Sequence, residues 1–340
     1  MNRVTTTDIA NQLGLSRSTI SKALNGSSKV DERTRLIVQQ TANEMGYANI
    51  KAKFSAPTLN KTLSIVVQDN LHSDPYWSVF TKGFGDEAVN MNFRYTVNVI
   101  SVEEEAELLL PRGFSGDPLM GLVTIGPFSE AYYYKIKESN VPAVYVDITR
   151  NICDSSIFGD TLFVCNREHT YEMTSHLIAA GHQRLGFVSA DVDCRSFHER
   201  WLGFRDALVS ADLPIMNDFN YGFVDGEVFE NIRQWVSSLK GFPTAFVCVN
   251  DFCALTVKSS LNEVGLKVPN DIALCGFDND RRLAALYPEL TTADSCAEYM
   301  GKRAMQQLFW RLNNLDAPYE TIKVASSVCY RNSTEGWGLI

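Results

Sequence analysis

The sequence predicts a small all-α helix-turn-helix domain followed by a larger α/β region built on parallel sheets. Residues 4–26 carry the pattern of two short helices that meet at Gly14. From residue 62 onward, apolar runs of strand length alternate with helical patterns. The chain has 340 residues, which is more than one ordinary hydrophobic core accommodates. We therefore expect at least two domains of different kinds.

Charge is distributed unevenly along the chain. The net charge is −9, yet residues 1–60 hold eight Lys and Arg against four Asp and Glu, a balance of +4. The remaining 280 residues hold 23 basic and 36 acidic side chains, a balance of −13. This asymmetry indicates a basic nucleic-acid-binding module attached to an acidic body.

Short helices with clear boundaries are predicted at the N-terminus. Thr5 and Asp8 form a capping box that starts the first helix, because each can satisfy a backbone amide near the other. Gly14 ends this helix, and Ser16 caps the second one. A third helix ending near Gly46 completes a helix-turn-helix plan. The apolar residues expected in the shared core of the first two helices are Ile9, Ala10, Leu13, Ile20 and Leu24.

The outward face of the second helix predicts contact with DNA. Arg17 and Lys22 can donate to N7 and O6 of guanine in the major groove, and Ser18 and Ser21 suit base edges or phosphates. A solvated charged face is the simpler alternative, but the glycine turn, the caps and the apolar residues occur together, which favours DNA binding. Asn25 either contacts DNA or closes its helix. The predicted contacts of this domain are Thr5, Ser16, Arg17, Ser18, Ser21, Lys22, Asn25, Lys29 and Arg33, the last two to phosphates.

The order of these residues resembles the DNA-binding domain of the lactose-repressor (LacI/GalR) family. The shared pattern is VTxxDIAxxxGLSxSTISxALN, followed by Val-x-x-x-Thr-Arg at 30–35 and Gly-Tyr at 46–47. The resemblance implies that Arg17, Ser18 and Lys22 read an operator sequence. The predicted helix-turn-helix domain spans residues 1–46.

Residues 47–61 form a predicted hinge linker that departs from the family pattern. In the family this segment becomes a helix on DNA, and a leucine from each subunit enters the minor groove. Here Asn49 stands where proline is expected, and the leucine position holds Ser55 or Ala56. Phe54 is close enough to serve as the apolar wedge that contacts DNA instead. A flexible tether is an equally good interpretation.

The large region predicts two parallel sheets covered by helices. Alternation of apolar runs with helical patterns is typical of βαβ units, and 280 residues exceed a single doubly wound domain. The predicted strands are 63–67, 95–100, 122–125, 143–146, 185–188, 245–249 and 272–275. Predicted helices include 168–180, 200–210 and 252–264.

This region resembles the effector domain of the same family, which is similar to periplasmic sugar-binding proteins. The resemblance implies two lobes, one of residues 62–161 with 292–323 and one of 162–291 with 324–340, that together bind an effector and dimerise. The motifs that carry it are Asp74-Pro75-Tyr76-Trp77, His176-Leu177-Ile178, Gly181-His182-Gln183-Arg184, Arg200-Trp201-Leu202-Gly203-Phe204, Val249-Asn250-Asp251, Asp271-Ile272-Ala273, Gly276-Phe277-Asp278 and Leu290-Thr291-Thr292.

Polar residues at strand ends are the candidate effector-binding groups. Asp147, Asn250 and Asp278 each end or directly follow an apolar strand, and ligands bind outside the carboxyl ends of parallel strands. Arg200 begins a predicted helix. Its guanidinium can donate two hydrogen bonds, to two hydroxyls or to one carboxylate. The resemblance implies that Arg200, Asn250 and Asp278 bind the effector. The alternative role for each is a helix cap or an interdomain hydrogen bond. The flat rings that suit a sugar are Tyr76 and Trp77.

Other kinds of chemistry find little support in the sequence. The family motif D-N-x-x-G is replaced by Cys165-Asn166-Arg167-Glu168-His169, so we expect an effector other than the commonest ones.

The eight cysteines are scattered and the histidines lack metal-ligand spacing, so we expect no metal and no cofactor. No catalytic constellation and no apolar run of signal or membrane-span length occurs, so we expect a cytoplasmic protein that is not an enzyme.

The sequence therefore predicts a sequence-specific transcriptional repressor controlled by a small polar effector, a sugar or sugar derivative, between two lobes. We expect a homodimer on a pseudo-palindromic double-stranded DNA operator, because one small head offers little surface for tight binding. A corepressor-dependent regulator is an alternative within the family. A sugar-binding transport protein is an alternative of another class, but it would need an export signal and would have no use for residues 1–46.

Overall fold

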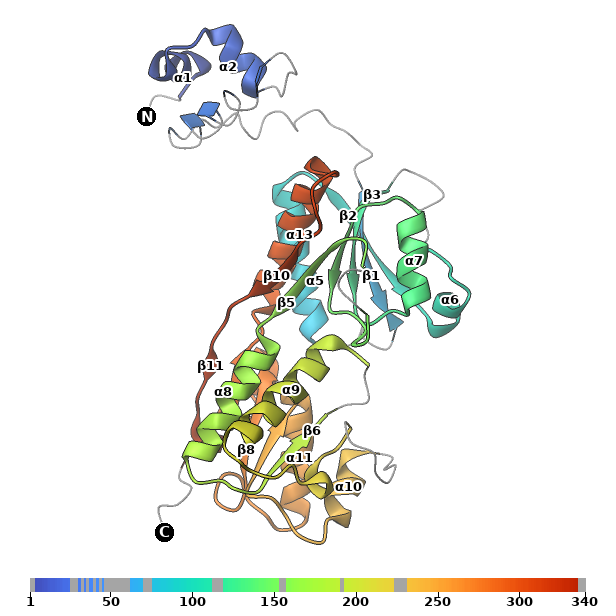
Figure 1. The fold of residues 1–340 in the computed structure, drawn as a ribbon, viewed down its shortest axis with the longest axis vertical. Helices are drawn as coiled ribbons and strands as arrows, with labels where there is room; N and C mark the ends of the chain where they lie inside the picture. The colour runs from blue at the N-terminus through green and yellow to red at the C-terminus, as the bar shows by residue number, and fades with distance from the viewer. Residues whose placement is uncertain are drawn as a thin grey trace. The chain divides into compact units, whose positions relative to one another are not determined.

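The computed structural model describes most of the chain (Figure 1). The chain divides into two compact units, Met1–Lys61 and Thr62–Ile340. The predicted linker 47–61 lies outside the described residues. Those residues are 4–24, eight positions between 30 and 45, and 62–69, 75–111, 119–152, 157–189, 193–222 and 231–335.

The N-terminal unit contains the two predicted helices, α1 (Thr6–Leu13) and α2 (Arg17–Leu24). The capping box of Thr5 and Asp8 is present, with both side chains bonded to each other's backbone amides. Gly14 ends α1 in the left-handed region, with φ of 64°, a conformation that glycine adopts without steric cost. The turn between the helices is therefore set by local chemistry.

Caps and a small apolar core complete this unit. Ser16 accepts a hydrogen bond from the Thr19 amide at 3.1 Å, and Asp31 accepts one from the Thr34 amide at 2.9 Å. The first bond confirms the predicted cap of the second helix, and the second bond lies at the start of the third helix. Leu13 and Leu24, both predicted to lie in the core, are only partly buried at its margin. The buried core residues are Ile9, Ala10, Ile20, Ala23, Val30, Val38 and Ala42.

The first sheet of the large unit contains, within the described ranges, six parallel strands in the order β10-β5-β4-β3-β1-β2. The four strands predicted here are confirmed as β1–β4. β5 and β10 escaped prediction, because β5 begins with a charged residue and β10 is an edge strand without a continuous apolar run. The bounds are β1 (Thr62–Gln68), β2 (Arg94–Ile100), β3 (Leu119–Ile125), β4 (Ala143–Val146), β5 (Asp160–Val164) and β10 (Thr321–Val324).

The second sheet has the strand order β11-β9-β8-β7-β6 and confirms the three strands predicted for it. All its pairings are parallel except that of β11 with β9. β9 and β11 were not predicted, because β9 is largely polar and β11 has only two residues. The bounds are β6 (Leu185–Val188), β7 (Ala245–Cys248), β8 (Ala273–Asp278), β9 (Thr291–Asp294) and β11 (Val328–Cys329).

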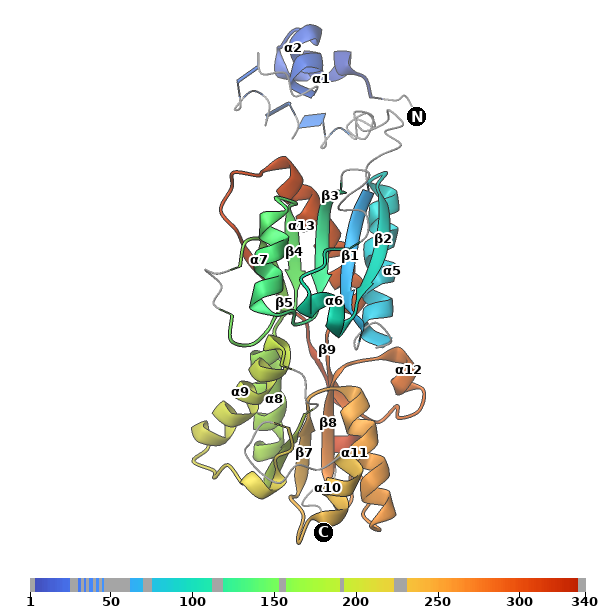
Figure 2. The same ribbon diagram turned by 90° about the vertical axis from the view of Figure 1, so that its right-hand side faces the viewer.

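Helices cover both faces of each sheet (Figure 2). In the first lobe α5 and α13 pack together on one face and α6 and α7 lie on the other; in the second, α8 packs against α9 and α10 against α11. None of the helices that the structure describes is both long and apolar enough to cross a bilayer. Their bounds are α5 (Pro75–Asn90), α6 (Val102–Ala106), α7 (Glu130–Glu138), α8 (Asn166–Ala179), α9 (Arg195–Ser210), α10 (Ile232–Ser238), α11 (Asp251–Glu263), α12 (Arg281–Ala284) and α13 (Ala297–Asn313).

Two glycines allow α5 and α13 to approach each other closely. A Cβ at Gly301 would lie 2.0 Å from the carbonyl oxygen of Phe80, and one at Gly83 would lie 2.0 Å from that of Glu298. Glycine is required at both positions because the opposing atoms belong to backbone and cannot rotate away. This contact joins the beginning and the end of the first lobe.

The two sheets define two lobes within the large unit. The chain leaves the first lobe after β5, returns after β9 and leaves again after β10, so the crossings follow Val164, Asp294 and Val324. The sequence placed these crossings after 161, 291 and 323. β9 pairs with β8 and so belongs to the second lobe, whereas the predicted boundary assigned most of it to the first.

Candidate functional site

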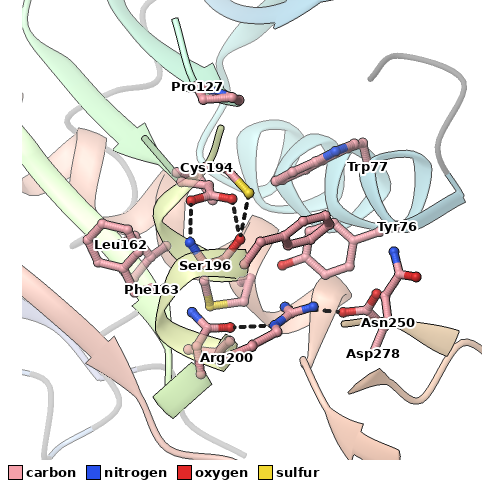
Figure 3. A pocket seen from close by; sticks show the side chains of 16 residues that line it. Tyr76, Trp77, Pro127, Leu162, Phe163, Cys194, Ser196, Arg200, Asn250 and Asp278 are labelled. Atoms are coloured by element: carbon pink, nitrogen blue, oxygen red, sulfur yellow. Dashed lines mark hydrogen bonds and ion pairs between the residues drawn. The ribbon is translucent and has the colours of Figure 1, made fainter. Parts of the chain in front are cut away.

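A cavity of about 70 Å³, lined by apolar and polar side chains, lies between the two lobes (Figure 3). It is bordered by the carboxyl ends of β4 and β5 in the first lobe and by the first turns of α8 and α9 in the second. This is the edge at which parallel sheets bind ligands. The structure brings all six residues predicted to bind an effector to this cavity, namely Tyr76, Trp77, Asp147, Arg200, Asn250 and Asp278.

Arg200 is a buried cation, with only 5% of its surface exposed, whose donors are held in fixed directions. Its Nε donates to Asn166 Oδ1 at 2.9 Å, and Nη1 donates to the Val249 carbonyl at 2.7 Å. Its Nη2 lies 3.5 Å from Asp278 Oδ1, and the guanidinium stacks 3.6 Å from the Phe277 ring centroid. A buried guanidinium needs such partners, because desolvation without them is costly. Arg200 is therefore a preorganised donor.

The start of α9 differs from the prediction. Arg200 was expected to begin this helix, but α9 begins at Arg195, so Arg200 lies in its second turn. The residue before the helix is Cys194, whose side chain makes no cap hydrogen bond. The sequence therefore carries no capping signal at the true start.

Asp147 supplies the missing cap from the other lobe. One carboxylate oxygen accepts a hydrogen bond from the Ser196 amide at 3.1 Å, and the other accepts one from the Ser196 hydroxyl. The Ile148 amide also donates to Asp147 at 3.0 Å. Asp147 has a positive φ of 57°, an uncommon conformation for a residue with a side chain. Its carboxylate thus caps α9 and joins the lobes at the edge of the cavity.

Further bonds surround Asp147 and form what we call the inter-lobe contact, between residues 147–152 and 193–196. Arg150 Nε lies 2.7 Å from Asp193 Oδ1 in an ion pair about half exposed on each side. The Arg195 amide donates to the Ile148 carbonyl at 2.7 Å, and its guanidinium donates to the Ile152 carbonyl. The inter-lobe contact therefore ties a loop after β4 to the start of α9.

Asn250 has the capping role that was its structural alternative. Its Oδ1 accepts a hydrogen bond from the Cys253 amide at 2.8 Å and caps α11. Among the described residues, none bonds to its side-chain nitrogen, which leaves that amide group as the part of Asn250 that a ligand can use. Figure 3 shows Asn250 beside Asp278 at the edge of the cavity.

Two aromatic rings form the wall contributed by α5. The Tyr76 and Trp77 rings meet edge to face with centroids 4.5 Å apart, and Trp77 packs in the same way on Phe80 at 5.8 Å. Burial, together with the charges of Asp278 and Asp147, raises the pKa of Tyr76 well above its usual range. Its phenol therefore stays protonated and can donate a hydrogen bond near two carboxylates.

Some cavity residues were missed by the sequence reasoning. Asn166 holds Arg200 and lies within 3.4 Å of Glu199, and it follows β5 as Asn250 follows β7. The strand-end rule would have found it if β5 had been predicted. Ser196 and Cys194 reach the cavity only because α9 begins five residues before Arg200.

The predicted DNA contacts lie on and around α2. Arg17, Ser18 and Lys22 are exposed, whereas Ser21 is half-buried. Thr5 and Ser16 are exposed too, but their hydroxyls take part in the caps described above. The predicted contacts outside the described residues are Asn25, Lys29, Arg33 and Phe54.

In the described part of the chain, cysteine thiols and potential metal ligands do not form clusters. No group of three or more His, Cys, Asp or Glu side chains there could hold a metal ion. The seven described cysteines are all free thiols, of which Cys194, Cys248, Cys253 and Cys275 are buried. Burial raises the pKa of Cys194, Cys248 and Cys275, which keeps these three thiols protonated and unreactive.

Two family models match separate parts of the chain. Residues 5–49 match the bacterial regulatory proteins of the lacI family. Residues 174–334 match the periplasmic binding protein-like domain. The chain thus contains a lacI-family helix-turn-helix domain and a periplasmic binding protein-like domain. These two matches correspond to the helix-turn-helix head and the two-lobed α/β body that the sequence predicted.

Curated repressors match this chain over almost its whole length. The probable HTH-type transcriptional repressor ExuR of Bacillus subtilis is 26% identical over 334 residues, 97% of this chain and 98% of that protein. The HTH-type transcriptional repressor PurR of Mannheimia succiniciproducens is 25% identical over 336 residues, 96% of this chain and 98% of that protein. Both are transcriptional repressors rather than enzymes.

Solved structures of LacI-family regulators share the fold. The transcriptional regulator CelR in complex with cellobiose superposes with a TM-score of 0.68 and 22% identity, over 97% of this chain and all of that one. The Lac repressor dimer bound to operator and the anti-inducer ONPF superposes with a TM-score of 0.67 and 20% identity, over 98% and 99% of the two chains. At these identities the likeness establishes the fold.

Proposed function

We propose that this chain is a transcriptional repressor whose operator binding is controlled by a small polar effector, a sugar or sugar derivative, bound in the inter-lobe cavity. The observation that carries the proposal is the cavity itself. It combines a fixed guanidinium, two carboxylates, two amides and four aromatic rings, and it receives side chains from both lobes. Hydroxyl-rich rings need such paired donors and acceptors next to flat apolar faces.

Operator binding is assigned to α2. Its exposed Arg17, Ser18 and Lys22 supply the donors that read base edges in the major groove, while α1 packs behind it. A single head of this size buries about 600–1,000 Å² on DNA, which is small for tight specific binding. The proposal is therefore a homodimer on a pseudo-palindromic operator, acting in the cytoplasm where the DNA is.

Control by an effector requires that it favour one arrangement of the lobes over another. A ligand held between Arg200 of the second lobe and Tyr76 of the first changes the free energy of that arrangement. The linker 47–61 enters the first lobe at β1, so we assign it the transmission of that change to the heads.

The test measures effector binding and operator binding on the same protein. A thermal-shift screen of sugars, sugar acids and sugar phosphates identifies the effector, because a ligand of the folded state raises the unfolding midpoint. Arg200→Ala should abolish this shift and the response of operator affinity to the effector. Affinity for the operator in the absence of effector should stay unchanged.

Lys240→Ala is the matched control, since Lys240 is a cation of the second lobe away from the cavity. It should leave both measurements unchanged. An Arg200→Ala protein that still responds to the effector would place the binding site elsewhere. A complete screen without any shift would contradict the effector class.

A further inference from the structure

The turn of residues 278–280, at the end of β8, has a strained backbone and borders the inter-lobe cavity. Asp278 has a φ of 113° and Asn279 a φ of 51°, two consecutive positive values at residues that carry side chains. Such conformations are unfavourable and persist only where neighbouring groups hold them. Asp278 lines the cavity, and its Oδ1 lies 3.5 Å from Arg200 Nη2. Whatever holds this turn therefore also holds a partner of Arg200.

The carboxylate of Asp251, the first residue of α11, holds the inner side of the turn. Its Oδ2 accepts a hydrogen bond from the Asp280 amide at 2.9 Å. Its Oδ1 accepts one from the Thr292 hydroxyl at 2.6 Å, and the oxygen of that hydroxyl accepts from the Asn279 amide at 3.2 Å. One carboxylate thus binds two backbone amides of the turn, one directly and one through Thr292.

The side chain of Asn279 holds the outer side of the turn. It donates to Asp294 at 3.3 Å and accepts from Arg331 at 2.8 Å. These bonds do not involve Asp251. They anchor the outer side when the inner bonds weaken, so the turn can open locally while the second lobe stays folded.

The Asp251 carboxylate is enclosed by the protein. Only 3% of the surface of Asp251 is exposed. A Cβ at Gly276 would lie 2.4 Å from its Oδ1, so glycine is required for β8 to come this close. A charge in such a position has lost its hydration and depends on the groups around it.

Those groups only partly compensate for the burial of this charge. The Thr292 hydroxyl, the Asp280 amide and Arg200 of α9 favour the ionised carboxylate, whereas the Asp280 carboxylate opposes it. Burial is the largest influence, and it raises the pKa of Asp251 to about 6. The adjacent strands contribute thiols that burial keeps neutral, namely Cys248 on β7 and Cys275 on β8.

A proton on Asp251 leaves the turn with its bonds. The Oδ1 hydrogen then donates to Thr292, and the Thr292 hydroxyl can turn to the Ala293 carbonyl, 3.4 Å away. Oδ2 continues to accept from the Asp280 amide. The protonated acid therefore fits the closed turn without a buried charge.

The direction of the pH effect follows from proton linkage. In the closed turn the carboxyl keeps its proton up to about pH 6. When the turn opens, water reaches the carboxyl and its pKa returns toward the ordinary value near 3.8. Loss of the proton therefore favours the open turn, and binding of the proton favours the closed one.

We propose that Asp251 is a proton-operated latch on the turn 278–280 of the cavity wall. With the proton bound, the turn keeps its strained conformation and Asp278 stays beside Arg200. Without the proton, the turn opens more often and Asp278 loses its fixed position. An ordered wall binds a ligand more tightly, so under the proposed function effector affinity falls as the pH rises.

Hydrogen–deuterium exchange of the full-length chain, without any ligand, measures the opening of the turn. Protection factors, which remove the intrinsic pH dependence of exchange, are determined for residues 278–282 and for β7. The turn should be less protected than β7, because it opens locally. With a pKa of about 6 in the closed turn and near 3.8 in the open one, its protection should fall about tenfold between pH 5 and pH 7.5.

Three variants assign the effect to Asp251. Asp251→Asn has no proton to release and should show the same protection at both pH values. Asp316→Asn, at an exposed aspartate, is the matched control and should behave as the wild type does. Thr292→Val removes a donor that favours the ionised carboxylate, so the fall in protection should move to higher pH. Thr292→Val decides the question if Asp251→Asn does not fold.

Each of the other outcomes would overturn the latch. Protection of the wild-type turn that does not change with pH would show that its opening is not linked to a proton. A fall that persists in Asp251→Asn, or that keeps its midpoint in Thr292→Val, would assign the proton to another group. Equal protection of the turn and β7 would show that the turn opens only when the whole unit unfolds. None of these results involves a ligand, so the proposed function is tested separately by Arg200→Ala.

Discussion

At the scale of single residues, strand-end chemistry located the candidate site. Asp147, Asn250 and Asp278 come from strands that are distant in sequence, yet they line one cavity. This part was predictable because the carboxyl ends of parallel strands meet at one edge. Their individual bonds were not predictable. Asn250 caps its own helix, whereas Asp147 caps a helix of the other lobe, and only the positions of both lobes decide this.

Arg17 should read one base pair of the operator. Its exposed guanidinium, at the first position of α2, can donate two hydrogen bonds to one guanine base, at N7 and O6. Arg17→Ala is expected to cost about 1–3 kcal/mol of binding free energy and to relax preference at one operator position. Binding to an operator library with single base changes measures this. A uniform loss over all sequences would show a phosphate contact instead.

Asp251 should make stability fall as pH rises from about 4 to about 6. Burial raises its pKa to about 6, although the Thr292 hydroxyl and the Asp280 amide donate to it. The folded state thus holds a proton that the unfolded state, with a pKa near 3.8, has already lost. A shift of this size corresponds to about 3 kcal/mol.

Urea unfolding of the wild type and Asp251→Asn between pH 4 and 7 isolates this effect. The unfolding free energy of the wild type, relative to the variant, should decrease by up to about 3 kcal/mol over that range. Asp316→Asn, at an exposed aspartate, is the matched control. A difference between the wild type and Asp251→Asn that did not change with pH would contradict a raised pKa of Asp251.

At the scale of elements, apolar runs and caps predicted most of the fold. Seven strands and the helices of the head were predicted, because apolar runs and helix caps can be recognised within a few residues of sequence. The elements that were missed, β5, β9, β10 and β11, are short or polar and are strands because a neighbour pairs with them. The start of α9 was missed for a related reason, since its cap comes from Asp147.

Gly301→Ala tests the contact between α5 and α13. The added methyl would meet the Phe80 carbonyl at 2.0 Å, and neither helix can move without disturbing the first sheet. Overpacking of this kind costs about 1–3 kcal/mol of unfolding free energy. Denaturant unfolding measures it. The matched control is Gly241→Ala, where the nearest atom is 3.7 Å away and no loss is expected.

At the scale of the whole molecule, the inter-lobe contact couples the arrangement of the lobes to the cavity. Asp147 belongs to both, because its carboxylate caps α9 and borders the cavity. We propose that a ligand which changes this cap also changes the orientation of one lobe relative to the other. Control of operator binding by an effector requires such a difference in ligand affinity between two lobe arrangements.

Asp147→Ala should loosen the start of α9. Loss of a cap costs about 0.5–2 kcal/mol, so amide exchange over residues 195–200 should become about tenfold faster. Arg150→Ala removes only the half-exposed ion pair with Asp193, which is worth less than about 1 kcal/mol, and should have a smaller effect. Equal rates in both variants would show that the carboxylate does not hold the lobes together.

The sequence by itself determined the helix-turn-helix head, the alternation of strands and helices, and the six residues around the cavity. These follow from caps, periodicity and strand ends, which act over a few residues. Only the tertiary structure decided which groups those six residues bond and where α9 begins. Each of these depends on atoms brought together from two lobes, and their separation in sequence carries no local signal.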